Sequence, residues 1–212
     1  MNPKQIHQEN LANTIISNLK KRQMEGYYCP TATEATNLSL SFLNENDNVA
    51  FGGSMTLEEC GLLARLKERK DIHLHDRFAV ESKEEVQEVY VQTLLADYYF
   101  LSSNAITTEG ELVNIDGFGN RVSSLIFGPK NVVVLLGMNK VTANIKEAYQ
   151  RIKRLAAPAN CNRLEKKTPC ATSGICGDCY NSDCICSQIV ITRRSTIPNR
   201  IKVILIGEEL GY

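Results

Sequence analysis

Residues 131–138 read N-V-V-V-L-L-G-M and are apolar at almost every position. A strand with one face in solvent alternates apolar and polar residues, because successive side chains point to opposite faces of the sheet. An almost unbroken apolar run therefore predicts a strand that is covered on both faces, as in parallel sheets flanked by helices. Residues 201–206 have the same character and predict a second buried strand.

Shorter apolar segments alternate along the chain with segments of helical periodicity. Strands are predicted at 48–51, 72–76 and 98–101, and helices at 57–69, 83–97 and 145–155. The last helix is expected to end before Pro158, and residues 123–127 fit either a strand or the rim of a loop. This alternation predicts an α/β fold with an open, mostly parallel sheet flanked by helices.

The composition limits the organisation of the chain and its partners. The 212 residues, 43% of them hydrophobic, are expected to form a single α/β domain over residues 1–212. Lys plus Arg and Asp plus Glu number 24 each, which argues against a nucleic-acid partner. There is neither an apolar signal core at the N-terminus nor a run of about 18 apolar residues, so no membrane span and a cytoplasmic location are expected.

A glycine-rich turn, Gly52-Gly53-Ser54, follows one predicted strand and precedes a predicted helix. Thr56 and Glu59 have the spacing of a capping box for that helix. Exposed backbone amides at a helix N-terminus attract anions, and glycine allows a close approach, so Gly52, Gly53, Ser54 and Thr56 are candidate ligand-binding residues. The spacing is neither that of a dinucleotide fingerprint nor that of a P-loop, and a tight turn without a ligand remains the alternative.

Residues 103–121 contain two short β-type runs joined at 109–111, and end in the turn D-G-F-G-N-R. This pattern fits a β-hairpin with a polar tip, or a loop that binds a ligand on a rigid scaffold. In the second interpretation Asn104 and Asn120 orient the ligand.

Ligands of open α/β sheets bind beyond the carboxyl ends of the strands, where the polar clusters of this chain are expected to meet. We expect Arg121 to pair with a substrate carboxylate, Lys140 to add a second positive charge, and Asp116 to act as a general base. The alternative is that Asp116 and Asn120 only cap a hairpin turn.

Six of the eight cysteines fall within residues 161–186. The core of this segment is C-x5-C-x2-C-x6-C, formed by Cys170, Cys176, Cys179 and Cys186, and few neighbouring residues could form a hydrophobic core. These four are the candidate ligands of a metal, which would supply folding free energy; Zn²⁺ and an Fe–S cluster both fit. Unliganded thiols and redox chemistry of Cys176 and Cys179 remain alternatives.

Several of these motifs together resemble the LUD-domain family, which includes lactate-utilisation protein C. The matching segments are G-G-S-M-T-L at 52–57, S-N-A-I-T at 103–107, E-L-V-N-I-D-G-F-G-N-R at 111–121, F-G-P-K at 127–130, G-M-N-K at 137–140, A-A-P-A-N at 156–160 and T-P-C at 168–170. The resemblance implies the superfold of ribose-5-phosphate isomerase and coenzyme A transferases, with a C-terminal cysteine-rich loop. It does not carry over any catalytic residue.

The cysteine block places the chain in a shorter branch of the family, in which Cys184 is usually a different residue, so Cys184 and Cys161 are reserve ligands. One expected function is a component of lactate or related organic-acid utilisation, with a cysteine-bound metal or Fe–S centre. Its expected partners are a small anionic metabolite and Fe–S redox proteins, and a homo-oligomer is possible. The other is a non-redox ligand-binding or isomerase/transferase-like protein with a structural zinc.

Overall fold

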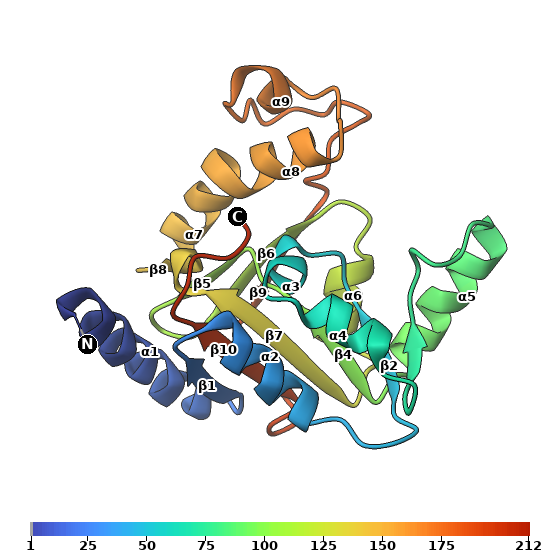
Figure 1. Cartoon of the computed structure of the whole chain (residues 1–212). Coiled ribbons are helices and arrows are strands. Elements are labelled where there is room, and N and C mark those ends of the chain that lie inside the picture. Colours follow the sequence, from blue (N-terminus) through green and yellow to red (C-terminus); the bar gives the residue numbers. More distant parts are fainter. Residues whose placement is uncertain (1) are drawn as a thin grey trace.

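A six-stranded sheet forms the centre of the computed structural model, which describes residues 2–212 (Figure 1). Its strand order is β1-β10-β7-β4-β2-β3, and every neighbouring pair is parallel. The strands are β1 (Glu25–Cys29), β10 (Ile201–Ile206), β7 (Asn131–Gly137), β4 (Tyr98–Leu101), β2 (Asn48–Phe51) and β3 (His73–His75). The predicted α/β fold with an open, mostly parallel sheet is therefore confirmed.

Helices cover both faces of this sheet, which explains why β7 has no polar alternation. One face packs against α2 (Ala32–Ser41), α3 (Met55–Glu59) and α4 (Leu62–Glu68). The other face packs against α1 (Pro3–Lys21), α6 (Asn120–Ile126) and part of a second sheet. Along β7, residues 132–136 are fully buried, as the sequence predicts.

The second sheet has the strand order β8-β5-β6-β9 and contains the predicted hairpin. The hairpin strands, β5 (Ala105–Thr107) and β6 (Leu112–Asp116), pair antiparallel, and Gly110 has a φ of +86° in the turn between them. The outer strands are β8 (Val141–Thr142) and β9 (Gln188–Thr192). Ala105 and Val113 of the hairpin pack against the helical segment at 145–163, so this sheet lies between that segment and the main sheet.

The predicted single helix over 57–69 is wrong, because the structure divides it at Gly61. Gly61 has a φ of +80°, a left-handed conformation that interrupts the helix, and α4 starts at the next residue. The predicted capping box is also replaced: the Ser54 hydroxyl, two residues earlier than Thr56, accepts the hydrogen bond from the Leu57 amide.

The expected end of a helix before Pro158 is also wrong. The chain continues from α7 (Ile145–Arg151) through one π-turn, η2 (Ile152–Ala156), into α8 (Ala157–Arg163). Proline cannot donate a backbone hydrogen bond, but it is tolerated in the first turn of a helix. In the π-turn the Ala157 amide bonds to Ile152 O, five residues back, and Pro158 then lies at the start of α8.

Residues 123–127, expected as a strand or a loop rim, belong mainly to α6, which starts after Gly119 (φ +88°). The buried Arg200 guanidinium holds the C-terminal end of this helix. It donates to the carbonyl oxygens of Ser124 at 3.0 Å, Leu125 at 2.8 Å and Pro129 at 2.8 Å. These hydrogen bonds join the C-terminal end of α6 to the segment directly before β10. Helix α6 in turn carries Arg121.

The remaining elements are α5 (Lys83–Leu94), the short turn η1 (Met138–Lys140) and α9 (Pro169–Ser173). Helix α9 is the only regular element between Lys166 and Gln188 in the described chain, and this cysteine-rich segment lies beyond α8 (Figure 1). No helix among residues 2–212 combines the length and the apolar character that crossing a bilayer requires.

Replacing Arg200 with methionine is expected to lower the free energy of unfolding by about 2–4 kcal/mol, because three buried carbonyl groups lose their donor. Urea denaturation measures this loss. Arg193→Met, at an exposed position in the same connection, is the matched control and is expected to change stability by less than about 0.5 kcal/mol. Equal losses in the two variants would contradict the anchoring role of Arg200.

Candidate functional site

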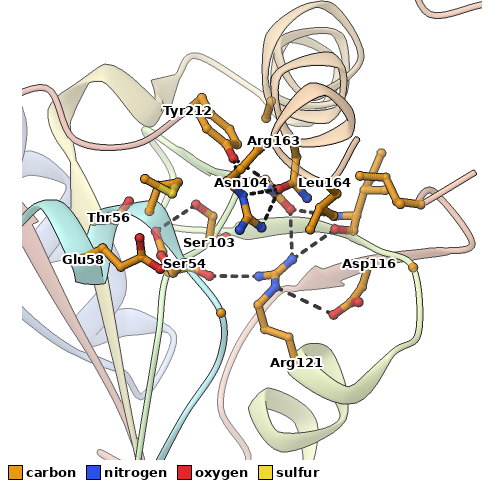
Figure 2. A pocket seen from close by; sticks show the side chains of 18 of the residues that line it. Ser54, Thr56, Glu58, Ser103, Asn104, Asp116, Arg121, Arg163, Leu164 and Tyr212 are labelled. Carbon is orange, nitrogen blue, oxygen red and sulfur yellow. Dashed lines mark hydrogen bonds and ion pairs between the residues drawn. The ribbon is translucent and has the colours of Figure 1, made fainter. Parts of the chain in front are cut away.

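A cavity of about 890 Å³ lies at the carboxyl edge of the main sheet. The neighbouring strands β2, β4 and β7 end there, so the segments that follow them meet as the sequence predicts. Figure 2 shows Ser54, Thr56 and Glu58 on one side, Tyr212 and Arg163 at the top, and Arg121 below. The polar lining consists of Ser54, Thr56, Glu58, Lys67, Arg77, Ser102, Ser103, Asn104, Asp116, Asn120, Arg121, Lys140, Asn160, Arg163, Lys166 and Tyr212.

The glycine-rich turn has two different structural roles. Gly53 lines the cavity, and a β-carbon at this position would lie 2.9 Å from Nη2 of Arg77. Gly52 lies behind the lining, where a β-carbon would meet the Tyr99 hydroxyl at 2.7 Å. The first glycine thus allows close packing under the site, and only the second borders the ligand space.

The Arg121 guanidinium is engaged in several hydrogen bonds within the protein. Its Nη1 donates to Ser102 O at 2.8 Å and to Asn114 Oδ1, and its Nη2 donates to Asn104 Oδ1 at 3.0 Å and Ile115 O at 3.0 Å. Both terminal nitrogens therefore hold the end of β4 and the hairpin together. Its predicted pairing with a substrate carboxylate stays a prediction.

Asp116 and Asn120 lie beside Arg121 in the turn that leads into α6. The Asp116 carboxylate accepts hydrogen bonds from the amides of Gly119 at 3.2 Å and Val122 at 3.1 Å. It also lies 3.7 Å from Nε of Arg121. This is the geometry of the turn-capping alternative. Both residues still line the cavity, so the general-base role of Asp116 remains a prediction.

Lys140 lies at the end of η1, directly after β7, and is 3% exposed. Its Nζ donates to Thr56 Oγ1 at 2.6 Å and to Ser102 Oγ at 3.1 Å. Burial, together with the charges of Arg151 and Arg121, lowers the pKa of Lys140 to about 7, while Glu59 acts weakly in the opposite direction. The amine therefore exchanges its proton near neutral pH.

Arg151 does not line the cavity but acts on Lys140, and the sequence interpretation missed it. It is 8% exposed, and it donates from Nε to Asn139 O at 3.1 Å and from Nη1 to Asn104 O at 2.8 Å. Its Nη2 has no hydrogen-bond partner among residues 2–212. A cation on the buried, alanine-bearing face of a helix was the signal that could have revealed it, since charged residues are rarely buried there.

Arg163 and Tyr212 were missed as well. Arg163 Nε donates to the Tyr212 hydroxyl at 2.8 Å and to Asn160 Oδ1 at 3.1 Å, and this group forms the upper wall of the cavity (Figure 2). Tyr212 is the last residue of the sequence, and no local pattern marks it as a site residue.

The charges around the cavity are unbalanced. Six basic side chains line it, five of them besides Lys140 with its pKa of about 7, against the two carboxylates of Glu58 and Asp116. Lys67 pairs with Asp76, and Arg121 lies near Asp116. Within residues 2–212, the other four have no carboxylate partner: Arg77, Lys140, Arg163 and Lys166. A net positive cavity favours an anionic ligand.

The cysteine segment adjoins the same cavity, because Leu164, Lys166 and Ile185 line it. Cys161 and Cys170 are buried, whereas Cys176, Cys179, Cys184 and Cys186 are half-buried. Several of these thiols raise one another's pKa. Burial raises the pKa of Cys161, and so do the thiols of Cys170 and Cys184, against a hydrogen bond from Thr168 that lowers it. Burial, then Cys184, Cys161 and Cys176, raises the pKa of Cys186 to about 12.

All six cysteines of the segment are unpaired thiols. From Asn2 to Tyr212, no group of three or more His, Cys, Asp or Glu side chains is arranged to hold a metal ion. The predicted ligands Cys170, Cys176, Cys179 and Cys186, with Cys161 and Cys184 in reserve, therefore stay a prediction.

The fold and the site define an α/β protein with a cationic cavity at the carboxyl edge of a parallel sheet. A family model described as the LUD domain matches residues 12–206. The chain therefore belongs to the LUD-domain family, which confirms the resemblance seen in the sequence. Comparison with curated proteins finds no match.

Solved structures with a similar fold include a DUF162 family protein from Deinococcus radiodurans, with a TM-score of 0.55 and 11% identity over 94% of this chain and 98% of that one. The delta subunit of eIF2B from Chaetomium thermophilum has a TM-score of 0.36 and 18% identity over 66% and 54% of the two chains. A D-ribose-5-phosphate isomerase in complex with phospho-erythronic acid has a TM-score of 0.36 and 14% identity over 64% and 66%.

The lowered pKa of Lys140 predicts a specific dependence of stability on pH. The native amine releases its proton near pH 7, whereas the unfolded chain holds it up to the ordinary value of 10.5. Between these values the unfolded state binds more protons, so the free energy of unfolding must rise with pH. The difference between the wild type and Lys140→Met, measured by urea denaturation, isolates this contribution. Parallel profiles for the two proteins across that range would contradict it.

Proposed function

We propose that this LUD-domain protein binds a small organic acid, lactate or a related hydroxy- or oxo-acid, in the cavity at the carboxyl edge of the sheet. The observation that carries the proposal is the excess of cationic side chains there. A carboxylate ligand supplies the missing negative charge, and Asn104, Asn120 and Ser54 offer amide and hydroxyl groups for its remaining oxygens. The family's link to lactate utilisation supports the choice of acid.

Isothermal titration of lactate and pyruvate, with the neutral amide lactamide as the reference ligand, tests this proposal. We expect the two acids to bind and lactamide to bind much more weakly. Arg163→Gln is expected to weaken acid binding roughly 10- to 100-fold, the loss of one hydrogen bond to a charged group. Arg154→Gln, an exposed arginine on the same helical segment, is the matched control and should bind like the wild type. Equal affinity for lactamide would overturn the proposal.

The cysteine segment supports a second part of the proposal, a metal centre bound by Cys170, Cys176, Cys179 and Cys186. Cys161 and Cys184 are further candidates, because their thiols neighbour those of Cys170 and Cys186. A bound Fe–S cluster would supply electron transfer beside the cavity, with a separate Fe–S protein as redox partner. Zinc at the same residues would order the segment without redox chemistry.

Metal analysis and absorbance of the anaerobically purified protein separate these two functions. A brown protein that absorbs near ~400 nm supports the organic-acid oxidoreductase component, and a colourless one with stoichiometric zinc supports the non-redox alternative. That alternative is a ligand-binding or isomerase/transferase-like protein.

We expect Cys176→Ser and Cys179→Ser to abolish metal binding and to loosen residues 161–190, measured by metal content and amide hydrogen exchange. Cys60→Ser, a buried thiol outside the segment, is the matched control and should keep its metal. Full occupancy in both segment variants would show that these cysteines are not ligands.

A further inference from the structure

We propose that Lys140 is a nucleophilic amine that binds a 2-oxo acid covalently, as an imine on its Nζ. The inference rests on the proposed function, because it requires that the cavity accept a small organic acid. It adds to that function a covalent step and a choice of substrate class, a carboxylate with an adjacent carbonyl group.

The position of Lys140 brings its amine to the ligand space. Lys140, Thr56 and Ser102 all line the cavity, and the two hydroxyl oxygens hold the Nζ at 2.6 Å and 3.1 Å. Thr56 belongs to α3 and Ser102 follows β4, so the amine is held between the ends of three neighbouring strands. The side chain is fixed in this place, because only 3% of the residue is exposed.

The surroundings of Lys140 favour the neutral amine over the ammonium ion. None of the ion pairs among residues 2–212 includes Lys140. The charged groups that act on it are Arg151 of α7 and Arg121 of α6, which oppose its charge, and Glu59 of α3, which favours it. The Glu59 carboxylate is occupied elsewhere, since it accepts the Gly211 amide at 2.6 Å.

This arrangement is unsuited to a purely electrostatic role. A lysine that serves as a fixed positive charge gains from a carboxylate partner or from water, whereas desolvation beside other cations produces a reactive amine. The pKa of about 7 leaves a substantial fraction of the amine unprotonated at neutral pH. Arg163 and Lys166, which also line the cavity, supply the positive charge that a carboxylate needs.

The covalent step is balanced without any further reactant. The lone pair of Nζ adds to the carbonyl carbon, and the carbonyl oxygen takes up a proton as its π bond breaks. The nitrogen then releases its protons, and the former carbonyl oxygen leaves as water when the C=N bond forms. Amine and oxo acid thus yield imine and water, with no change of oxidation state. The hydroxyl groups of Thr56 and Ser102, which contact Nζ, are placed to relay these protons.

Reductive trapping on the full chain tests the inference. The protein is incubated with pyruvate and sodium cyanoborohydride, digested, and mapped by mass spectrometry. We expect one reduced pyruvate adduct on the peptide that spans Lys140, and none on Lys67 or Lys166, the other lysines of the cavity. Lactate has the carboxylate but no carbonyl, so it should form no adduct and should compete with pyruvate. Lys140→Arg is expected to lose the adduct, and Lys146→Gln, at an exposed lysine of α7 that does not line the cavity, to keep it.

The outcomes separate the covalent step from the proposed function. If calorimetry shows that pyruvate binds but no adduct forms on Lys140, the imine is overturned and the organic-acid function stands. If neither pyruvate nor lactate binds, the proposed function fails, and the imine with pyruvate fails with it. An adduct spread over exposed lysines as well as Lys140 would also overturn the inference, because it would show unselective amine chemistry.

Discussion

The Arg121 guanidinium joins the two sheets of this protein, and the shape of the cavity depends on that junction. Its donors bond at once to Ser102 at the end of β4 and to Asn104, Asn114 and Ile115 of the hairpin. Without the guanidinium, these oxygen atoms would lose a hydrogen-bond donor, and unpaired buried oxygens lower the free energy of unfolding. Gly52 has no side chain, and a β-carbon there would collide with the Tyr99 hydroxyl and crowd the Arg121 side chain. The glycine therefore leaves room for this arrangement.

With Arg121 committed to the scaffold, the other cations define the chemistry of the cavity. Arg163 and Lys166 line it, while Arg151 and Arg121 act on Lys140. The positive field favours an anionic ligand, and it adds to burial, the larger cause, in lowering the pKa of Lys140. A binding site for an organic acid and a reactive lysine are compatible results of one arrangement of charges.

The cysteine segment is physically connected to this cavity. Leu164, Lys166 and Ile185 contribute to the lining, and Gly117, after the hairpin, packs so closely on Ile185 that a β-carbon would lie 3.2 Å from its Cα. Whatever orders the segment therefore also completes the wall of the cavity. A metal centre in the segment would thus influence ligand binding by shape, whether or not it carries electrons.

The parallel α/β fold, the hairpin and the edge of the sheet at which the cavity lies could all be predicted from the sequence. These follow from local periodicity: the apolar run of β7 permits burial on both faces, and polar residues follow β2, β4 and β7. The hydrogen bonds, burial and protonation of the site residues could not be predicted, because they depend on contacts between distant parts of the chain. Thr56 and Lys140 are 84 positions apart, and the desolvation and cationic neighbours that set the pKa of Lys140 arise only when the chain is packed. The helix that passes Pro158 also has no local pattern that predicts it: it contains a π-turn, whose residues Ile152 and Ala156 pack against the hairpin.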